Sequence, residues 1–196
     1  ADIGFISFTA EMSLGTEEQG GMCLTDQAPL AERMRSIRGQ GGQKVSGNQT
    51  DSQGVGGMDP LQAAPLLAKF ETLPDEIRLR QEIAKLYTKY LDENPLLVTP
   101  YVPEEVFPVW SRYSLLTESD EDRSTMVKKL KEAGIVADIY CSRPLYLQDD
   151  FADLQYREGD FPISDDYASR IFNVPLHSKL TSKEQEDIAD LLNDWQ

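Results

Sequence analysis

The sequence predicts an α/β fold, on three observations. Short apolar runs at 3–8 and 20–25 have the length and residue types of strands. Segments between 26 and 92 repeat their apolar residues at helical spacing. Residues 93–196 then alternate strand-like and helix-like stretches. A chain of 196 residues that mixes both periods is large enough for one large domain or two small ones.

The first part of the chain is expected to hold a strand pair and one helix. Residues 3–8 read as a short buried strand, and 20–25 as its antiparallel partner after a turn rich in glycine. Asp26 is a suitable N-cap for a helix to about Arg38. The expected buried face of this helix comprises Leu30, Met34 and Ile37. Residues 39–57 carry seven glycines and few apolar side chains, which predicts a flexible loop.

Two helices are predicted next, because Pro74 interrupts a long helical pattern. The first opens at Asp59-Pro60, with proline at the first helical position, and runs to about Leu73. Its inward residues are expected to be Ala63, Ala64, Leu67 and Phe70. The second runs over 75–92. Its inward residues are expected to be Ile77, Ile83, Leu86, Tyr87 and Tyr90, with Glu76, Arg80 and Lys89 outward.

A smaller α+β unit is predicted after an irregular, proline-rich linker at 93–108. A capping box at Thr181–Glu184 opens its last helix, whose apolar stripe includes Ile188 and Trp195. The other expected elements are strands at Val109–Leu116 and Ile135–Cys141, helices at Asp122–Ala133 (with Gly134 as C-cap) and Ser164–Phe172, an irregular stretch at 142–163 and a short extended piece at Val174–Leu176.

Composition excludes several classes of function. Lysine plus arginine number 19 and aspartate plus glutamate 34, and the resulting charge of −15 disfavours binding to nucleic acid or anionic membranes. No apolar stretch is long enough to span a membrane, and no secretion signal is recognised, which predicts a cytoplasmic protein. One histidine, His177, and two cysteines without metal-ligand spacing disfavour a metal site or a Ser-His-Asp triad.

Four groups of short motifs follow one another along the chain. The first group combines Ser7-Phe8 with Leu14-Gly15 and Gly20-Gly21, and the second combines Leu30–Arg35 with Met58–Ala64. The third group is Val109–Tyr113. The fourth group comprises Gly134-Ile135, Pro144-Leu145, Gly159–Ser164 and Val174–His177. In this order and at these intervals they resemble the DegT-type sugar aminotransferases, which are fold-type I pyridoxal-phosphate (PLP) enzymes. The resemblance covers essentially the whole chain, but only about the C-terminal half of a family member.

The resemblance implies a fold and a chemistry. Residues 1–57 would be the end of a PLP-binding large domain, 58–92 bridging helices, and 93–196 a small C-terminal α+β domain. Relatives transfer an amino group, usually from glutamate, to a nucleotide-linked keto-sugar, and a lysine that forms a Schiff base with PLP serves as the acid and base. They are dimers whose subunits share active sites. A strand at the very start of the chain further suggests the back part of a longer protein.

The lysine position is where this sequence departs from the family. Ser7 matches a serine that contacts the PLP phosphate, but Met12 stands five residues on, where the Schiff-base lysine belongs. A thioether forms no imine, so we expect no covalent attachment of PLP and no retained catalytic residue. Three explanations stay open: an engineered lysine replacement, a natural pseudoenzyme or non-transaminating relative, or a misalignment within 9–19.

Other positions extend or limit the resemblance. Val55 and Gly57 replace a family asparagine and arginine, of which the asparagine reaches a neighbouring subunit's phosphate. Two tyrosines stand at family histidine positions, Tyr140 and Tyr146. His177 matches a family histidine and is interpreted as structural. Arg143 is a candidate bidentate donor to a substrate phosphate, against the alternative of an ordinary surface residue.

Three functions are therefore compared. The first is the C-terminal portion of a PLP-dependent sugar-nucleotide aminotransferase homologue, with Met12 at the lysine position. The second is a non-catalytic homologue that forms a dimer with an active paralogue or regulates it, as a heterodimer or a homodimer. The third, a dehydratase-like relative, is disfavoured because such relatives usually carry histidine there.

Overall fold

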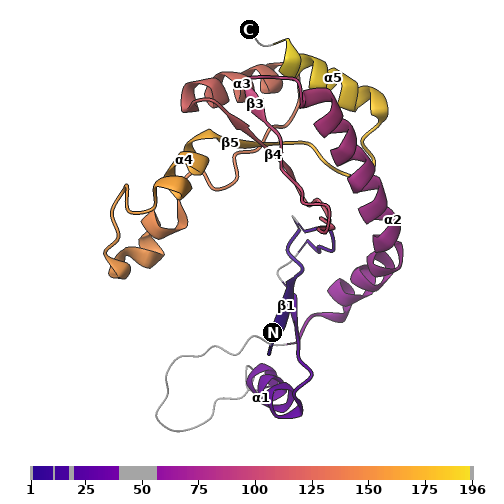
Figure 1. Cartoon of the computed structure of the whole chain (residues 1–196). Helices are drawn as coiled ribbons and strands as arrows, with labels where there is room; N and C mark the ends of the chain where they lie inside the picture. Colours follow the sequence, from indigo (N-terminus) through magenta and orange to yellow (C-terminus); the bar gives the residue numbers. More distant parts are fainter. Residues whose placement is uncertain (1, 11, 18–19, 40–56, 195–196) are drawn as a thin grey trace. The chain divides into compact units, whose positions relative to one another are not determined.

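A computed structural model describes residues 2–10, 12–17, 20–39 and 57–194. The chain divides into two compact units, residues 1–74 (unit 1) and residues 75–196 (unit 2). Figure 1 shows the order of the helices and strands along the chain. None of the helices in the described residues combines the length and the apolar character that crossing a lipid bilayer requires.

Unit 1 contains the expected antiparallel strand pair. Strand β1 (Gly4–Ser7) pairs with β2 (Gly21–Leu24), with Phe5 opposite Cys23 and Ile6 opposite Met22. The pairing confirms the prediction, but the burial predicted for the first strand is wrong. Phe5 is 82% exposed, and of the apolar residues in 3–8 only Phe8 is buried. The apolar residues predicted a strand correctly. Their burial, however, depends on which other segments pack against the strand, and the run itself contains no information on that.

Helix α1 (Ala28–Gly39) follows directly. It begins one residue later than an N-cap at Asp26 would place it. The Thr25 hydroxyl oxygen accepts a hydrogen bond from the Gln27 backbone N–H at 3.2 Å. Its expected buried face is also wrong: Leu30 and Met34 are half-buried and Ile37 is 52% exposed. No described residue of unit 1 buries this face completely.

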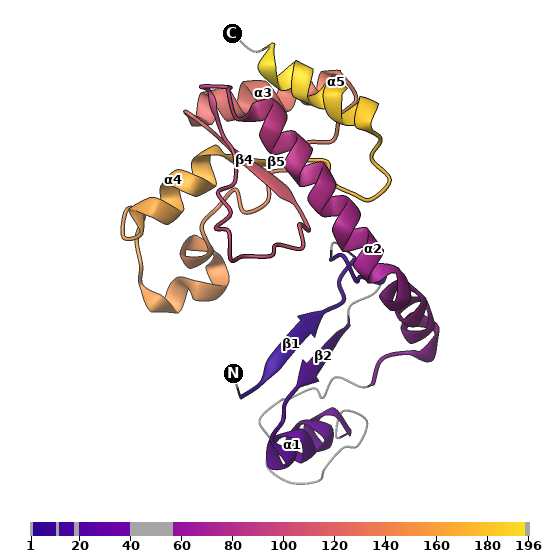
Figure 2. The same ribbon diagram turned by 45° about the vertical axis from the view of Figure 1, so that its right-hand side comes forward.

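Helix α2 (Pro60–Leu91) is one continuous helix, which corrects the predicted break at Pro74. Proline lacks the N–H that would donate to the carbonyl of Phe70, but its fixed φ is compatible with a helix, so the chain continues past the missing bond. The predicted start is confirmed, because the Asp59 carboxylate accepts a hydrogen bond from the Leu61 N–H at 2.7 Å. Figure 2 shows the helix from a second direction.

The two ends of α2 differ in burial. Within unit 1 the expected inward residues Leu67 and Phe70 are 70% and 62% exposed, and Leu66 is buried instead. Within unit 2, Ile83 and Tyr87 are buried as expected. Arg80, expected outward, turns in and donates to the carbonyls of Trp110 and Leu176 at 3.1 and 3.2 Å. Burial lowers the pKa of its guanidinium.

Unit 2 has a three-stranded antiparallel sheet in the order β3 (Leu97–Val98), β4 (Tyr113–Thr117) and β5 (Ile171–Val174). Alternate residues of β4 are buried, as its sequence pattern predicts. Helix α2 and the helices α3 (Asp120–Glu132) and α5 (Ser182–Asn193) share one apolar core with this sheet. The largest completely buried side chains of this core are Tyr87, Tyr113, Phe172, Leu91, Leu115, Met126, Leu130 and Leu192.

Several predicted bounds in unit 2 are wrong, and the strand expected at Val109–Leu116 begins only at Tyr113. The expected strand Ile135–Cys141 forms only one bridge, between Asp138 and Asn173, and Val136 is 79% exposed. Helix α4 (Pro162–Arg170) ends earlier than expected, so that 171–174 are in strand β5. Pairing with β4 outweighs helix propensity at these residues. The stretch predicted as irregular contains two short 3₁₀ turns, η2 (Leu145–Leu147) and η3 (Asp149–Leu154).

The predicted helix signals of unit 2 are confirmed. Gly134 follows α3 with a φ of +79°, a left-handed conformation that glycine adopts without strain. The capping box of α5 is complete: the Thr181 side chain accepts from the Glu184 N–H, and the Glu184 carboxylate accepts from the Thr181 N–H at 2.8 Å. Helix α3 begins two residues before the expected Asp122, after Ser119 as its N-cap.

Candidate functional site

Backbone hydrogen bonds hold the turn that follows β1, which we call the 8–16 turn and of which residue 11 lies outside the described residues. Phe8 donates its N–H to the Gly20 carbonyl at 2.8 Å, and Thr16 donates its N–H to the Phe8 carbonyl at 2.8 Å. A Cβ on Gly15 would lie 2.3 Å from the carbonyl oxygen of Thr9. Only glycine fits there, because a backbone oxygen has no room to move aside.

Ser7 stands at the entrance to this turn, at the end of β1. It is half-buried, and its hydroxyl donates to the Thr9 hydroxyl over a long 3.4 Å. Two neighbouring hydroxyls with weak mutual bonding retain the capacity to donate to another acceptor. Whether Ser7 contacts a phosphate stays a prediction.

Met12 lies within the turn. Its N–H donates to the Thr9 carbonyl at 2.9 Å, and the residue is 36% exposed. The thioether carries no ionisable proton and no nucleophilic amine.

Lys69 on α2 is the residue that the sequence analysis missed. Its ammonium group donates to the Gly15 carbonyl at 2.6 Å, across 54 positions of sequence. No sequence motif predicts this contact, because it forms only where α2 packs beside the turn. The hydroxyl of Ser13, in the same turn, is buried without a hydrogen-bond partner in the described residues.

These groups do not fit a covalently held PLP. An imine at position 12 needs a primary amine there, and this position carries a thioether instead. In its described residues the turn offers hydroxyl groups and a thioether, and the Lys69 ammonium group of α2 donates to its Gly15 carbonyl. That set is suited to hydrogen bonding with an anion and unsuited to bonding covalently with an aldehyde.

The candidate substrate residue Arg143 belongs to unit 2. It is exposed and lies 3.5 Å from the Asp149 carboxylate, so one partner already neutralises part of its charge. Ser7 belongs to unit 1 and Arg143 to unit 2.

The two tyrosines at histidine positions have separate surroundings in unit 2. Arg112 lies over the Tyr140 ring at 4.0 Å. Tyr146 donates its hydroxyl to the Asp165 carboxylate at 2.5 Å, and the second oxygen of that carboxylate accepts the Gly159 N–H at 3.0 Å. Loss of hydration, followed by the Asp165 hydrogen bond, raises the pKa of Tyr146 to about 12. Tyr146 is therefore a neutral donor that organises its loop.

The remaining predicted positions are placed as follows. His177 is exposed, and its backbone carbonyl accepts the Leu180 N–H at 3.0 Å. A Cβ on Gly57 would meet no atom within 4 Å. Val55 and the loop 40–56 lie outside the described residues.

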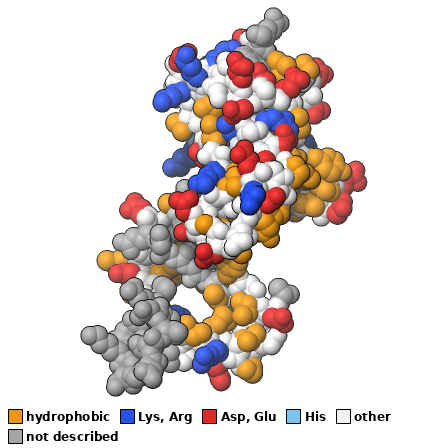
Figure 3. All heavy atoms as spheres, turned by 90° about the vertical axis from the view of Figure 1, so that its left-hand side faces the viewer, with side chains coloured by type: hydrophobic (Ala, Val, Ile, Leu, Met, Phe, Trp, Pro, Cys, Tyr) orange, Lys and Arg blue, Asp and Glu red, His pale blue; other side chains and the backbone are white. Residues whose placement is uncertain are grey.

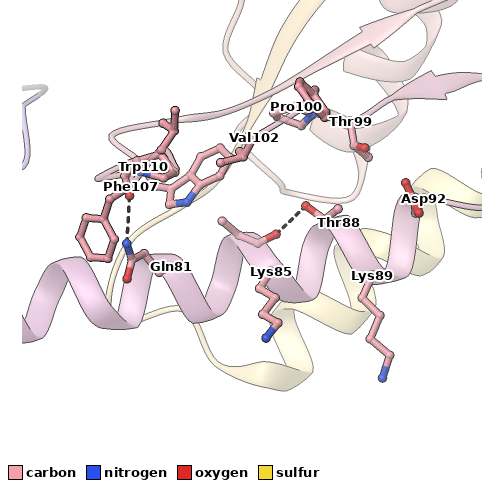
Figure 4. Close-up of a pocket in the computed structure, with 14 residues that line it drawn as sticks. Gln81, Lys85, Thr88, Lys89, Asp92, Thr99, Pro100, Val102, Phe107 and Trp110 are labelled. Atoms are coloured by element: carbon pink, nitrogen blue, oxygen red, sulfur yellow. Dashed lines mark hydrogen bonds between the residues drawn. The ribbon is translucent and has the colours of Figure 1, made fainter. Parts of the chain in front are cut away.

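Unit 2 also has an open cavity of about 650 Å³ between α2 and the segment 99–110. Figure 4 shows Trp110, Val102 and Pro100 facing the helix, whereas the ammonium groups of Lys85 and Lys89 point away from that segment. Gln81 joins the two sides by donating to the Pro108 carbonyl at 3.2 Å. The exposed surface of this cavity is mostly apolar, although Gln81, Lys85, Thr88, Lys89, Asp92 and Thr99 also line it. Among the described residues no cluster of histidine, cysteine, aspartate or glutamate is arranged to hold a metal ion.

Comparison with known proteins identifies the family to which the chain is similar. A family model described as the DegT/DnrJ/EryC1/StrS aminotransferase family matches residues 1–193. The chain is similar to the dTDP-3-amino-3,6-dideoxy-alpha-D-galactopyranose transaminase of Aneurinibacillus thermoaerophilus, with 29% identity over 98% of this chain and 51% of that protein. It spans about half the length of the curated relatives it matches.

Two solved structures have the same fold. A DegT DnrJ EryC1 StrS aminotransferase from Brucella abortus superimposes with a TM-score of 0.83 at 30% identity, over 97% of this chain and 50% of that one. S. venezuelae DesV, in complex with a ketimine intermediate, superimposes with a TM-score of 0.87 at 25% identity, over 98% of this chain and 51% of that one. The α/β architecture is that of the C-terminal portion of such an aminotransferase. The chain belongs to the DegT/DnrJ/EryC1/StrS aminotransferase family.

Proposed function

We propose that this chain is the C-terminal portion of a sugar-nucleotide aminotransferase homologue that is catalytically inactive as it stands. The observation that carries the proposal is the match of residues 1–193 to an aminotransferase family, combined with a thioether in the turn that follows β1. Relatives that are named as transaminases act on dTDP- and UDP-linked sugars. The substrate class is therefore a nucleotide-linked keto-sugar, with an amino acid, glutamate in the resemblance, as the amino donor.

The cofactor of the whole protein would be PLP. Ser7 is the residue of this chain that would donate to its phosphate, and Arg143 is the candidate for a substrate phosphate. Bound PLP would supply the electron sink for amino transfer. The chain's own contribution is the 8–16 turn, held by Gly15 and Lys69, which presents position 12. We further propose a cytoplasmic dimer, as the resemblance implies.

The experiment restores the amine at position 12. Met12→Lys is prepared together with the first half of the fold, and PLP uptake is followed by the absorbance of a lysine aldimine and by its reduction with borohydride. We expect an aldimine in Met12→Lys and none in the unchanged chain, because only a primary amine condenses with the aldehyde.

Met12→Arg is the matched control, since it has a similar length and a charge but forms no stable aldimine under these conditions. If Met12→Lys takes up no PLP, or if the unchanged chain forms the aldimine, position 12 is not the lysine position and the proposal fails. A glutamate-dependent amino transfer by Met12→Lys would extend the result from binding to activity.

A second candidate is a non-catalytic homologue that forms a dimer with an active paralogue. The thioether at position 12 and glycine at position 57 favour it, because both replace polar family residues. Affinity purification of the tagged protein from its own cells should recover a lysine-bearing family member at equimolar yield. Amino transfer by the pure homodimer would exclude this candidate.

A further inference from the structure

Lys69 brings a positive charge from helix α2 to the 8–16 turn. Its ammonium group donates to the Gly15 carbonyl at 2.6 Å, and within the described part of the chain Lys69 forms no ion pair. An ammonium group has three N–H donors and no acceptor. A single bond to a neutral carbonyl therefore leaves its charge uncompensated and two of its donors available.

This charge is held beside position 12. A Cβ on Gly15 would lie 3.0 Å from the Met12 carbonyl oxygen, so the backbone at residue 15 passes directly beside that at residue 12. The Met12 N–H is fixed within the same turn by its bond to the Thr9 carbonyl at 2.9 Å. The side chain at position 12 is neutral, but the turn that carries it is bonded to an ammonium group from a distant part of the sequence.

Few other charged groups of the described residues belong to the elements around the turn. Strands β1 and β2 carry no charged side chain. Glu17 after the turn and Glu71 on α2 are exposed, and Glu11 lies outside the described residues. Figure 3 shows Asp and Glu side chains interspersed with Lys and Arg side chains over one face of the molecule. Lys69 is itself exposed, so water and salt screen its charge and limit its effect to a modest one.

We propose that Lys69 is a positioning residue that acts on position 12 through its charge. It favours a negative charge on a group at this position and disfavours a second positive charge there. A neighbouring cation is one means by which proteins activate a lysine amine, because it favours the neutral, nucleophilic form. The inference deepens the proposed function and rests on it, since it assigns to α2 a part in the chemistry of the position that relatives use for the Schiff base.

A thiol introduced by Met12→Cys measures this charge without PLP. The variant is purified from the protein's own cells and treated with iodoacetamide over a range of pH, and mass spectrometry quantifies the modification. Cys141, exposed in unit 2, serves as the internal reference for the reagent. Because the thiolate is the form that reacts, the pH profile gives the pKa of the introduced thiol. We expect this pKa to be lower with Lys69 than with Lys69→Gln by about 0.5–1 unit, and the difference to shrink as salt is added.

Three substitutions of Lys69 separate its charge from its hydrogen bond. Lys69→Arg keeps the charge and the donors, Lys69→Gln keeps a donor without the charge, and Lys69→Met keeps neither. Lys85→Gln, further along α2, is the control for the change in net charge. We expect Lys69→Arg to leave the thiol pKa close to its value with lysine, and both neutral variants to raise it.

An equal thiol pKa in all of these variants overturns the inference. So does a Lys69→Gln variant that behaves like the chain with lysine, because the hydrogen bond alone would then account for the role of Lys69, and so does a Lys85→Gln variant that raises the pKa as much. Neither PLP nor activity enters these measurements. Failure here and failure of Met12→Lys to form an aldimine are therefore distinguishable.

Discussion

Gly15 determines whether the turn that presents position 12 can close. Its Cα approaches the backbone of Thr9 so closely that any Cβ would overlap a carbonyl oxygen. Its own carbonyl holds the ammonium group of Lys69 at 2.6 Å. Gly15 thus allows the chain to pass close to the Thr9 carbonyl, and its own carbonyl accepts the hydrogen bond from Lys69 of α2.

Gly15→Ala should therefore open the turn. Overpacking of this kind costs about 1–3 kcal/mol, so hydrogen exchange at the amides of Met12 and Thr16 should accelerate by roughly tenfold or more, as read by mass spectrometry or NMR. Gly4→Ala is the matched control, since a Cβ there would meet no atom within 4 Å. Similar exchange in both variants would contradict the proposed role of Gly15.

At the scale of elements, α2 contains prolines in two different settings. Pro60 is the first residue of the helix, where the missing N–H has no partner to lose. Pro74 is exposed in the interior, where the N–H to the Phe70 carbonyl is missing. The same residue type is favourable in one place and costly in the other.

Pro74→Ala should stabilise the protein by about 1–3 kcal/mol, since alanine restores the helical hydrogen bond. Pro60→Ala should change the free energy of unfolding by less than about 1 kcal/mol. Urea unfolding followed by far-ultraviolet circular dichroism measures both. A loss of stability in Pro74→Ala would mean that the protein requires a proline-bent helix at this point.

The capping box of α5 predicts a pH dependence. Hydrogen bonds from the Thr181 backbone and side chain lower the pKa of Glu184 below its ordinary value. A depressed folded-state pKa contributes stability above the unfolded pKa, and this stability is lost as the pH falls through the folded value. Glu184→Gln should thus unfold more easily than the unchanged chain near about pH 6, and the difference should shrink toward about pH 3. Glu118→Gln, at an exposed position after β4, is the control, and a difference independent of pH would refute the assignment.

The whole molecule combines a strong negative charge with an uncovered apolar surface. A charge of −15 opposes self-association, but Phe5, Ile6 and Met22 of the β1–β2 pair are exposed, and among the described residues these two strands pair only with each other. Produced alone, the chain should self-associate, and more strongly as salt screens the repulsion. Light scattering on Phe5→Lys should show less association, whereas Tyr101→Lys in unit 2 should not. A monodisperse, cooperatively melting unchanged chain would contradict this expectation.

Local signals were predictable because a few neighbouring residues decide them. The capping box at Thr181, the left-handed Gly134 and the alternation of β4 depend on residues within one or two turns of chain. The order of short motifs indicated the family in the same way, since it is a property of the sequence itself. Boundaries shifted where a partner strand competed with helix propensity, as at 171–174.

The amino-acid sequence by itself determined the mixture of strands and helices, the caps, the family resemblance and the chemical identity of position 12. Only the tertiary structure decided that α2 continues through Pro74, that Ile135–Cys141 forms a single bridge, and that Lys69 reaches Gly15. It also decided that Phe5 is exposed. The physical reason is that burial and long-range hydrogen bonds depend on which distant segments pack beside a residue. The pattern of neighbouring residues does not determine which segments those are.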